Sequence, residues 1–356
     1  MKNIKAIVSF MFFVISMITM LALTEDSSIA IQNGLVLCVN SIIPNLFPFF
    51  VVSNIWIISG NADILSTMLA PLMERLFHIS GASALAFLLG AIGGYPTGAG
   101  TVAQLYEKGQ ISKKDAEQAL LFCNNAGPAF TIGVVGISLF QSTAIGMTLY
   151  VIHILAALLV GIILRPDNVE PPETYATTDT SPKQFASIIT KAIKIGGNTT
   201  LLVCMYVVFF SFLLHTLQAV FDEIIPASIL LPTLGLLELT NGITIIGKSS
   251  LDLRLQFILA SAFLGFGGLS VLFQSISLLT PCGLSGGNML KGKLLQAAIS
   301  TVVSTLVQPI LFKHITCFGI LKNTPTIQPP LISAAMVFIF TILAKISSGK
   351  QTNYRL

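Results

Sequence analysis

Long apolar runs dominate this sequence. A helix needs about 20 apolar residues to cross the hydrocarbon core of a bilayer, and seven runs approach or exceed that length: 6–24, 30–59, 115–139, 142–165, 190–217, 289–313 and 330–346. Hydrophobic residues make up 54% of the chain and charged residues only 10%, so a water-soluble fold could not bury this much apolar surface. The sequence therefore predicts an all-α, polytopic membrane protein with the lipid bilayer as part of its surroundings.

The remaining composition argues against several functions. The 19 lysine and arginine residues are scattered between apolar runs and form no basic stripe, so we expect no nucleic-acid partner. The five cysteines have no CxxC spacing and no histidine at metal-ligand spacing, which predicts no metal site. No Walker A, HExxH or GxSxG motif is present. We therefore expect neither an enzyme nor a bound cofactor.

The N-terminal segment has two interpretations. Residues 1–26 combine Lys2 and Lys5 with a long apolar run, as a secretory signal peptide does. No A-x-A-like cleavage site follows, and the run is longer than a typical signal sequence. We favour a retained first transmembrane helix over a cleaved signal.

The chain also repeats part of itself. Residues 69–81 align without gaps to 230–242, and Gly93-Gly94 falls in register with Gly267-Gly268 in the same order along the chain. This similarity predicts two repeats, a polar linker and a polar tail: 27–165, 185–346, 166–184 and 347–356. Three crossings in each repeat, an odd number, would give the repeats opposite orientations in the membrane.

Each repeat contains an apolar stretch interrupted by a glycine pair. In 81–107 the interruption is followed by Pro96, which has no N–H to donate and disfavours helix at the residue before it. Broken backbone is tolerated within a membrane only where protein or a water-filled cavity satisfies its polar groups. We therefore predict re-entrant hairpins over 81–107 and 255–281. A kink or a glycine-lined packing face is the alternative.

The hairpin tips are the candidate binding site. Backbone N–H groups at helix N-termini attract anions, so the tips predict a small anionic substrate. The candidate residues of the two tips are Gly93, Gly94, Tyr95, Pro96 and Thr97, with Gly267, Gly268 and Ser270 as their counterparts.

A second interruption follows the first hairpin. Asn124 and Asn125 precede Gly127-Pro128 inside an apolar run, where lipid would not tolerate two amides. We expect them to face the protein interior as part of the site, with interhelical hydrogen bonding alone as the alternative. Their counterparts in the second repeat are Ser300 and Thr301.

Three charged residues in the second half need an interpretation. Glu238 is an acid in an apolar stretch, which makes it a functional candidate, although a position at headgroup level is equally compatible with its register. Lys291 and Lys293 flank an apolar run, so we expect both to extend toward the headgroups. With a cytoplasmic N-terminus and two hairpins, both lysines fall outside, whereas Lys108 and most other basic residues fall inside.

Three motifs carry a family resemblance: FPFFVVSN at 47–54, GGYPTGAGTVAQLYEKGQIS at 93–112 and NNAGP at 124–128. With these, the chain resembles the sporulation integral membrane protein YlbJ family over about residues 30–315. That family belongs to the nucleoside-recognition "Gate" group, which is similar to the concentrative nucleoside transporters. The resemblance implies an interfacial helix, a re-entrant hairpin and a broken transmembrane helix in each repeat.

The resemblance also implies a function. It indicates import of dipicolinic acid into the forespore through the outer forespore membrane, with Tyr95 as a stacking surface for the pyridine ring. The nucleoside transporters carry acidic residues at their tips and form trimers. Here the tips lack carboxylates, which argues against a nucleoside substrate and sodium coupling, and no sequence feature marks an interface for a homo-oligomer. A non-transporting scaffold or gating component of spore-envelope assembly, or a nucleoside or ion permease, remains as an alternative function.

Overall fold

A computed structural model describes residues 24–59, 62–166, 185–221, 224–225 and 233–318, together with scattered residues between 7 and 22. Half of the predicted N-terminal segment 1–26, the linker after residue 166, the run 330–346 and the tail 347–356 lie outside the described residues. The chain divides into two compact units, Met1–Pro309 and Ile310–Leu356. The fold and the site described below belong to the first unit.

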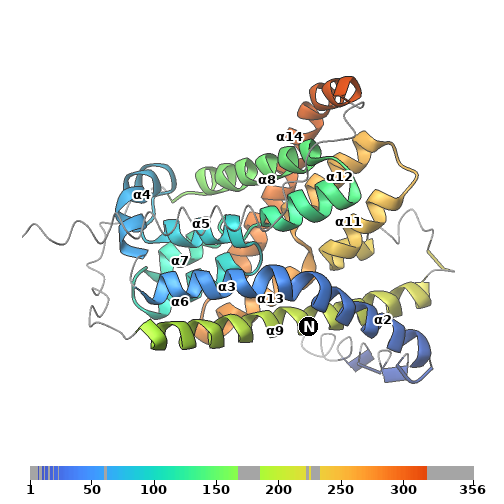
Figure 1. Ribbon diagram of the computed structural model, residues 1–356, viewed down its shortest axis with the longest axis horizontal. Helices are drawn as coiled ribbons and strands as arrows, with labels where there is room; N and C mark the ends of the chain where they lie inside the picture. The colour runs from blue at the N-terminus through green and yellow to red at the C-terminus, as the bar shows by residue number, and fades with distance from the viewer. Residues whose placement is uncertain are drawn as a thin grey trace, which may run out of the picture. The chain divides into compact units, whose positions relative to one another are not determined.

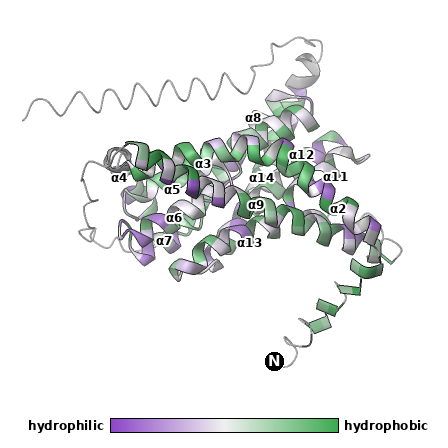
Figure 2. Cartoon of the chain, turned by 60° about the horizontal axis from the view of Figure 1, so that its bottom comes forward, coloured by the Kyte–Doolittle hydropathy of each residue, from purple (hydrophilic) through white to green (hydrophobic). Residues whose placement is uncertain are grey.

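The described part of the chain is helical and contains no strand. Four helical runs are long and apolar enough to cross a membrane: Thr143–Ile163, Phe185–Ala219, Leu253–Cys282 and Gly287–Lys313. They confirm the predicted all-α, polytopic class. Figure 2 shows hydrophobic residues along the long helices and hydrophilic residues gathered around α6 and α7. On α8 (Thr143–Ile163), Met147, Val151 and Leu155 form a row of about half-exposed side chains, as lipid-facing residues would.

The first half opens with a continuous helical run. It consists of α2 (Thr24–Leu37), the π-helical turn η1 (Cys38–Ile42) and α3 (Ile43–Ile58). This run lies along α9 (Phe185–Phe221), as Figure 1 shows. Cys38, Phe50 and Val203 are buried where the two meet. The helix α4 (Ala62–Phe77) follows and ends at Phe77, whose ring stacks on Phe122 with 4.6 Å between the ring centroids.

The segment 81–107 forms a tight hairpin. Its arms, α5 (Ser83–Gly93) and α6 (Thr97–Glu107), pack against each other and are separated by three non-helical residues, Gly94 to Pro96. Each arm has 11 residues, which is about 16 Å of helix, or roughly half the hydrocarbon thickness. The arms therefore have the length expected of a re-entrant hairpin.

The next segment, residues 113–139, is interrupted as predicted, and we call it the broken span. The short α7 (Lys113–Ala119) begins at Ser112, whose hydroxyl accepts a hydrogen bond from Asp115 N at 3.0 Å, a standard N-cap. Residues 124–127 are non-helical, and the π-helix η2 (Ala129–Leu139) starts after Pro128. η2 packs on α8, where Gly136 and Gly146 let the two backbones touch.

The two ends of α8 define two ends of the helix bundle. Its 21 residues span about 31 Å. At one end Gln118 Nε2 donates to Leu164 O at 2.8 Å, which places the start of the broken span beside the end of α8. At the other end lies the turn between Leu139 and Thr143.

The second predicted hairpin, 255–281, differs from the structure. Here α12 (Leu253–Phe266) and α13 (Gly268–Leu279) are separated only by Gly267. Both contact α11 (Leu239–Lys248), but α12 also packs on α8, whereas α13 packs mainly on α6 and α9. Gly267 and Gly268 both have left-handed φ values, +86° and +83°. One non-helical residue bends the chain but does not reverse it.

Contacts at its ends show that this bent segment crosses the bundle. Before it, Gly247 packs on Leu139, at one end of α8. After it comes the short η3 (Thr280–Cys282), where Cys282 Sγ lies 3.2 Å from Glu107 Oε1. Asn288 Nδ2, at the start of α14 (Gly287–Phe318), donates to Glu117 O at 3.3 Å, near the other end of α8. The segment therefore joins opposite ends, and α14 begins on the same side as Glu107 rather than on the opposite side.

Candidate functional site

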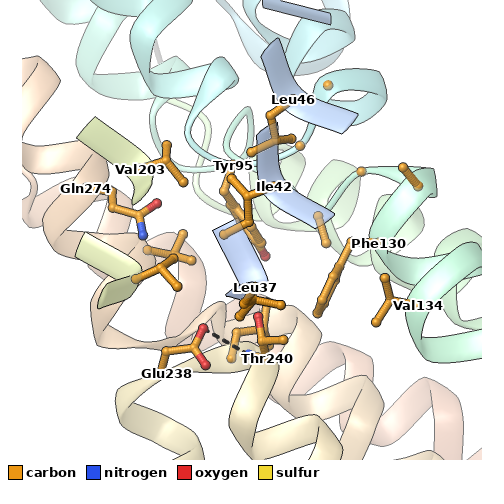
Figure 3. Close-up of a pocket in the computed structure, with 18 residues that line it drawn as sticks. Leu37, Ile42, Leu46, Tyr95, Phe130, Val134, Val203, Glu238, Thr240 and Gln274 are labelled. Carbon is orange, nitrogen blue, oxygen red and sulfur yellow. Dashed lines mark hydrogen bonds between the residues drawn. The ribbon is translucent and has the colours of Figure 1, made fainter. Parts of the chain in front are cut away.

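A cavity of about 160 Å³ lies where the interrupted elements meet. Its wall is formed by the tip of the α5–α6 hairpin, the residues after Asn125, the start of α11, the middle of α13, and apolar residues of η1, α3 and α9. Figure 3 shows Tyr95, Glu238 and Gln274 around the same space, with apolar side chains such as Leu37 and Phe130 completing the wall. A mostly apolar pocket with a few convergent polar groups is the usual form of a small-molecule site.

Glycines allow the hairpin tip to reach this position. Gly94 has a φ of +81°, and a Cβ on it would lie 2.9 Å from Gly127 N. A Cβ on Gly93 would lie 2.3 Å from the ring of Phe49. The tip therefore packs directly on the backbone of the broken span.

The second break lies against the first. A Cβ on Gly267 would lie 3.2 Å from Tyr95 Oη, and a Cβ on Gly268 would lie 3.0 Å from Leu239 N. The Tyr95 hydroxyl donates to Leu264 O at 2.8 Å, which fixes the tip of the hairpin to the last turn of α12. Sequence reasoning had placed both glycine pairs at one site, and the structure brings them together, although neither Gly267 nor Gly268 lines the cavity.

The two asparagines lie behind the cavity wall and are fully buried. Asn124 Nδ2 donates to Ser275 Oγ at 2.8 Å, while its Oδ1 has no hydrogen-bond partner. Asn125 Oδ1 accepts from Gln296 Nε2 at 3.1 Å. The residues that follow them, Ala126 and Gly127, line the cavity. The predicted alternative, interhelical hydrogen bonding, therefore describes the asparagine side chains, and the backbone after them forms the wall.

A buried lysine, Lys293, joins Asn124, Asn125 and Gln296 in a polar cluster behind the cavity wall. Lys293 is only 3% exposed, and its Nζ donates to Gln296 Oε1 at 2.7 Å. The same Nζ lies 5.0 Å from the centroid of the Tyr95 ring, within cation–π range. In the part of the chain that the structure describes, no carboxylate pairs with it. The expectation that Lys293 extends to the headgroups is therefore wrong, whereas Lys291 is exposed.

Histidine 153 belongs to the same cluster. Its side chain is 1% exposed, and its Nε2 accepts a hydrogen bond from Ala126 N at 2.9 Å. Gln296 Nε2 also donates to His153 O at 3.0 Å. Gln296 thus joins α14, α8 and the broken span, and it connects Lys293 with the backbone that forms the cavity wall.

Glu238 is the acidic residue of the cavity wall. It is 3% exposed and caps α11, because its two carboxylate oxygens accept hydrogen bonds from Thr240 N at 3.1 Å and Asn241 N at 2.7 Å. Gln274, on α13, faces the same cavity and donates to Ser270 Oγ at 3.2 Å. Glu238 is therefore buried in the cavity wall, and its functional role stays a prediction.

The other predicted residues have supporting or separate positions. Pro96 and Thr97 are buried behind Tyr95, and the backbone N–H groups of Gly94 and Thr97 bond to Gly90 O and Gly94 O rather than facing the cavity. Ser270 supports Gln274. Ser300 packs against α12, with its carbonyl accepting from Ser261 Oγ, and Thr301 bonds within its own helix. Ser300 and Thr301 are therefore not cavity residues.

The sequence contains one signal for Lys293 and Gln296, which were not predicted to belong to the site. Lys293, Gln296, Ser300 and Ser304 recur at helical spacing and are all buried, while Leu294, Val302 and Leu306 on the same helix are exposed. A membrane helix with its polar face inside and its apolar face outside has this pattern. The pattern places the polar face of α14 in the interior of the bundle.

Comparison with known proteins gives one curated relative. The chain is 26% identical over 335 residues to the sporulation integral membrane protein YlbJ of Bacillus subtilis (strain 168), covering 85% of this chain and 82% of the relative. No protein-family profile matches the chain. No solved structure matches it.

Proposed function

Because this chain belongs to the family of the sporulation integral membrane protein YlbJ, we propose that it is a carrier of a small anionic solute, dipicolinate, moved toward the forespore during sporulation. The kinship supports a membrane role in sporulation. Transport, the substrate and a location in the outer forespore membrane are our proposals. Dipicolinate follows from the resemblance of the motifs at 47–54, 93–112 and 124–128.

One observation carries the choice of an anion: the buried ammonium group of Lys293 beside the wall of the cavity. Burying an unpaired charge in a protein or a membrane costs several kcal/mol. Hydrogen bonding to Gln296 and the face of the Tyr95 ring offset only part of this cost. An anion held on the cavity side of Tyr95 would supply the missing opposite charge.

The hairpin tip supports the same proposal in a different way from that predicted. Two tip amides, those of Gly94 and Thr97, are bonded to backbone carbonyls and are not available to an anion, whereas Tyr95 lines the cavity. A planar aromatic dicarboxylate would find an aromatic surface and a nearby cation at Tyr95. The apolar remainder of the wall, including Leu37 and Val203, suits the pyridine ring.

The test is uptake of radiolabelled dipicolinate into proteoliposomes that contain only this protein. We expect Lys293→Met to reduce uptake at least about tenfold, because one lost charge interaction at an effective dielectric constant of 20 exceeds 1.4 kcal/mol over several ångströms. Lys291→Met is the matched control. It removes a lysine from the same helix at an exposed position and should leave uptake near the wild-type rate.

The outcomes separate the alternatives. Flat uptake by the wild-type protein under every ion gradient would refute dipicolinate transport. Unchanged uptake in a Lys293→Met protein that folds normally would refute the role of the lysine. Uptake of nucleosides or metal ions, with indifference to dipicolinate, would identify a permease of another kind. If no assay detects transport, and a variant no longer recovers a partner protein that the wild-type protein binds, the chain is a scaffold.

A further inference from the structure

The cavity presents a problem for an anion, because its wall also contains a carboxylate. Glu238 is the one acidic side chain among the residues that line it, and no lysine, arginine or histidine lines it in the part of the chain that the structure describes. Glu238 has no ion-pair partner among the described residues. An anion in the cavity therefore meets the negative charge of Glu238 as well as the positive charge of Lys293 behind the wall.

The position of Glu238 is fixed. Its backbone packs against Gly268, at the bend between α12 and α13, and both of its oxygens are held by the first turn of α11. The side chain thus cannot leave the wall without breaking its cap. At a separation of about 5 Å and an effective dielectric constant of about 20, the repulsion between two unit charges would weaken anion binding by on the order of 100-fold.

A proton on Glu238 removes this repulsion. The neutral carboxylic acid still accepts backbone hydrogen bonds through its carbonyl oxygen, and it offers an O–H donor to an anionic oxygen. The proton comes from water on the side where the anion enters and returns to water on the side where the anion leaves. No covalent bond is made or broken in the substrate.

We infer that Glu238 is the proton site of the carrier, so that the anion and one proton are bound in the cavity together. This inference rests on the proposed function and adds the coupling ion to it. The other titratable groups nearby are Tyr95 in the wall, and Lys293 and His153 behind it. The experiment must therefore distinguish Glu238 from these three.

The experiment is calorimetric titration of dipicolinate into the purified protein in lipid nanodiscs, without sodium. Between about pH 6 and pH 8 the free dicarboxylate stays ionised, since carboxylic acids ordinarily titrate near pH 4. We expect the wild-type affinity to fall about tenfold for each pH unit, because one proton is taken up with each anion. Titrations in two buffers of different ionisation enthalpy should report an uptake of close to one proton.

The variant Glu238→Gln should bind dipicolinate with little pH dependence and no proton uptake. Glu238→Asn is the second variant, because asparagine is among the best N-cap residues and keeps α11 capped. Glu74→Gln is the matched control. It makes the same chemical change at an exposed position on α4 and should titrate like the wild-type protein.

The failures are distinguishable. No dipicolinate binding by the wild-type protein at any pH overturns the proposed function. Binding without proton uptake, or proton uptake that persists in both Glu238 variants, overturns this inference alone and, in the second case, assigns the proton to Tyr95, Lys293 or His153. Binding of a metal cation in place of the proton, lost in Glu238→Gln, also overturns it and identifies a cation-coupled site.

Discussion

Two glycines of the hairpin determine how closely it approaches the broken span. A Cβ on Gly90 would lie 1.8 Å from Cys123 O, and one on Gly98 would lie 2.1 Å from the same atom. Both contacts are with backbone, which cannot rotate away as a side chain can. The carbonyl that precedes Asn124 therefore lies in a groove between the two arms, and this places Asn124 at the back of the cavity.

We expect Gly98→Ala to destabilise the protein by about 1–3 kcal/mol, because an extra methyl group forces the backbones apart. Gly133→Ala is the matched control, since a Cβ there meets nothing within 4 Å. Thermal unfolding in detergent should show a clear fall of the midpoint for the first variant and little change for the second. Equal midpoints for the two variants would contradict the close packing.

At the scale of elements, side chains link the interrupted segments. The broken span is joined to α13 by the hydrogen bond from Asn124 Nδ2 to Ser275 Oγ, and Ser275 Oγ in turn donates to Val271 O at 2.9 Å. Gln296 joins the same span to α14. The interrupted helices are thus held together by hydrogen bonds in a low-dielectric interior. There, neighbouring hydrogen bonds strengthen one another.

A double-mutant cycle of Asn124→Ala and Ser275→Ala should show a coupling energy of about 1 kcal/mol, the usual net value of a buried hydrogen bond. Unfolding free energies of the wild-type, two single-variant and double-variant proteins measure it. Thr148→Ala is a suitable partner for the control cycle with Asn124→Ala, because the Thr148 hydroxyl donates to Ala144 O within its own helix. Additive effects in the Asn124 and Ser275 cycle would show that the two segments are not joined by this bond.

At the scale of the whole molecule, the bend at Gly267 decides which loops share a side of the membrane. If residues 255–281 formed a hairpin, residues 249–252 and 283–286 would lie on the same side of the membrane. The contacts of Cys282 with Glu107 and of Asn288 with Glu117 instead place residues 283–286 beside α6 and α7. Lys291 then lies on the same side as Lys113.

Single cysteines test this arrangement in a background with the five native cysteines replaced. We expect Ser285→Cys and Lys113→Cys to react with a membrane-impermeant thiol reagent from the same side of the membrane, and Leu251→Cys from the opposite side. All three positions are exposed. If Ser285→Cys and Leu251→Cys react from the same side, residues 255–281 form a hairpin and do not cross the membrane.

The sequence alone was sufficient for the membrane class and for the breaks at Gly93-Gly94, Asn124–Pro128 and Gly267-Gly268, whereas a binding site near Tyr95 stays a prediction. These properties follow from local causes: apolar length, the missing N–H of proline and the freedom of glycine. The tertiary structure decided the rest. Whether a glycine pair reverses a helix or bends it depends on which helices receive its two arms, and whether a lysine reaches the headgroups or the interior depends on neighbours more than 100 residues away. Lys293 and Glu238 acquired their roles in this way, because a charged side chain in an apolar run has the same local sequence whether it faces lipid, water or a cavity.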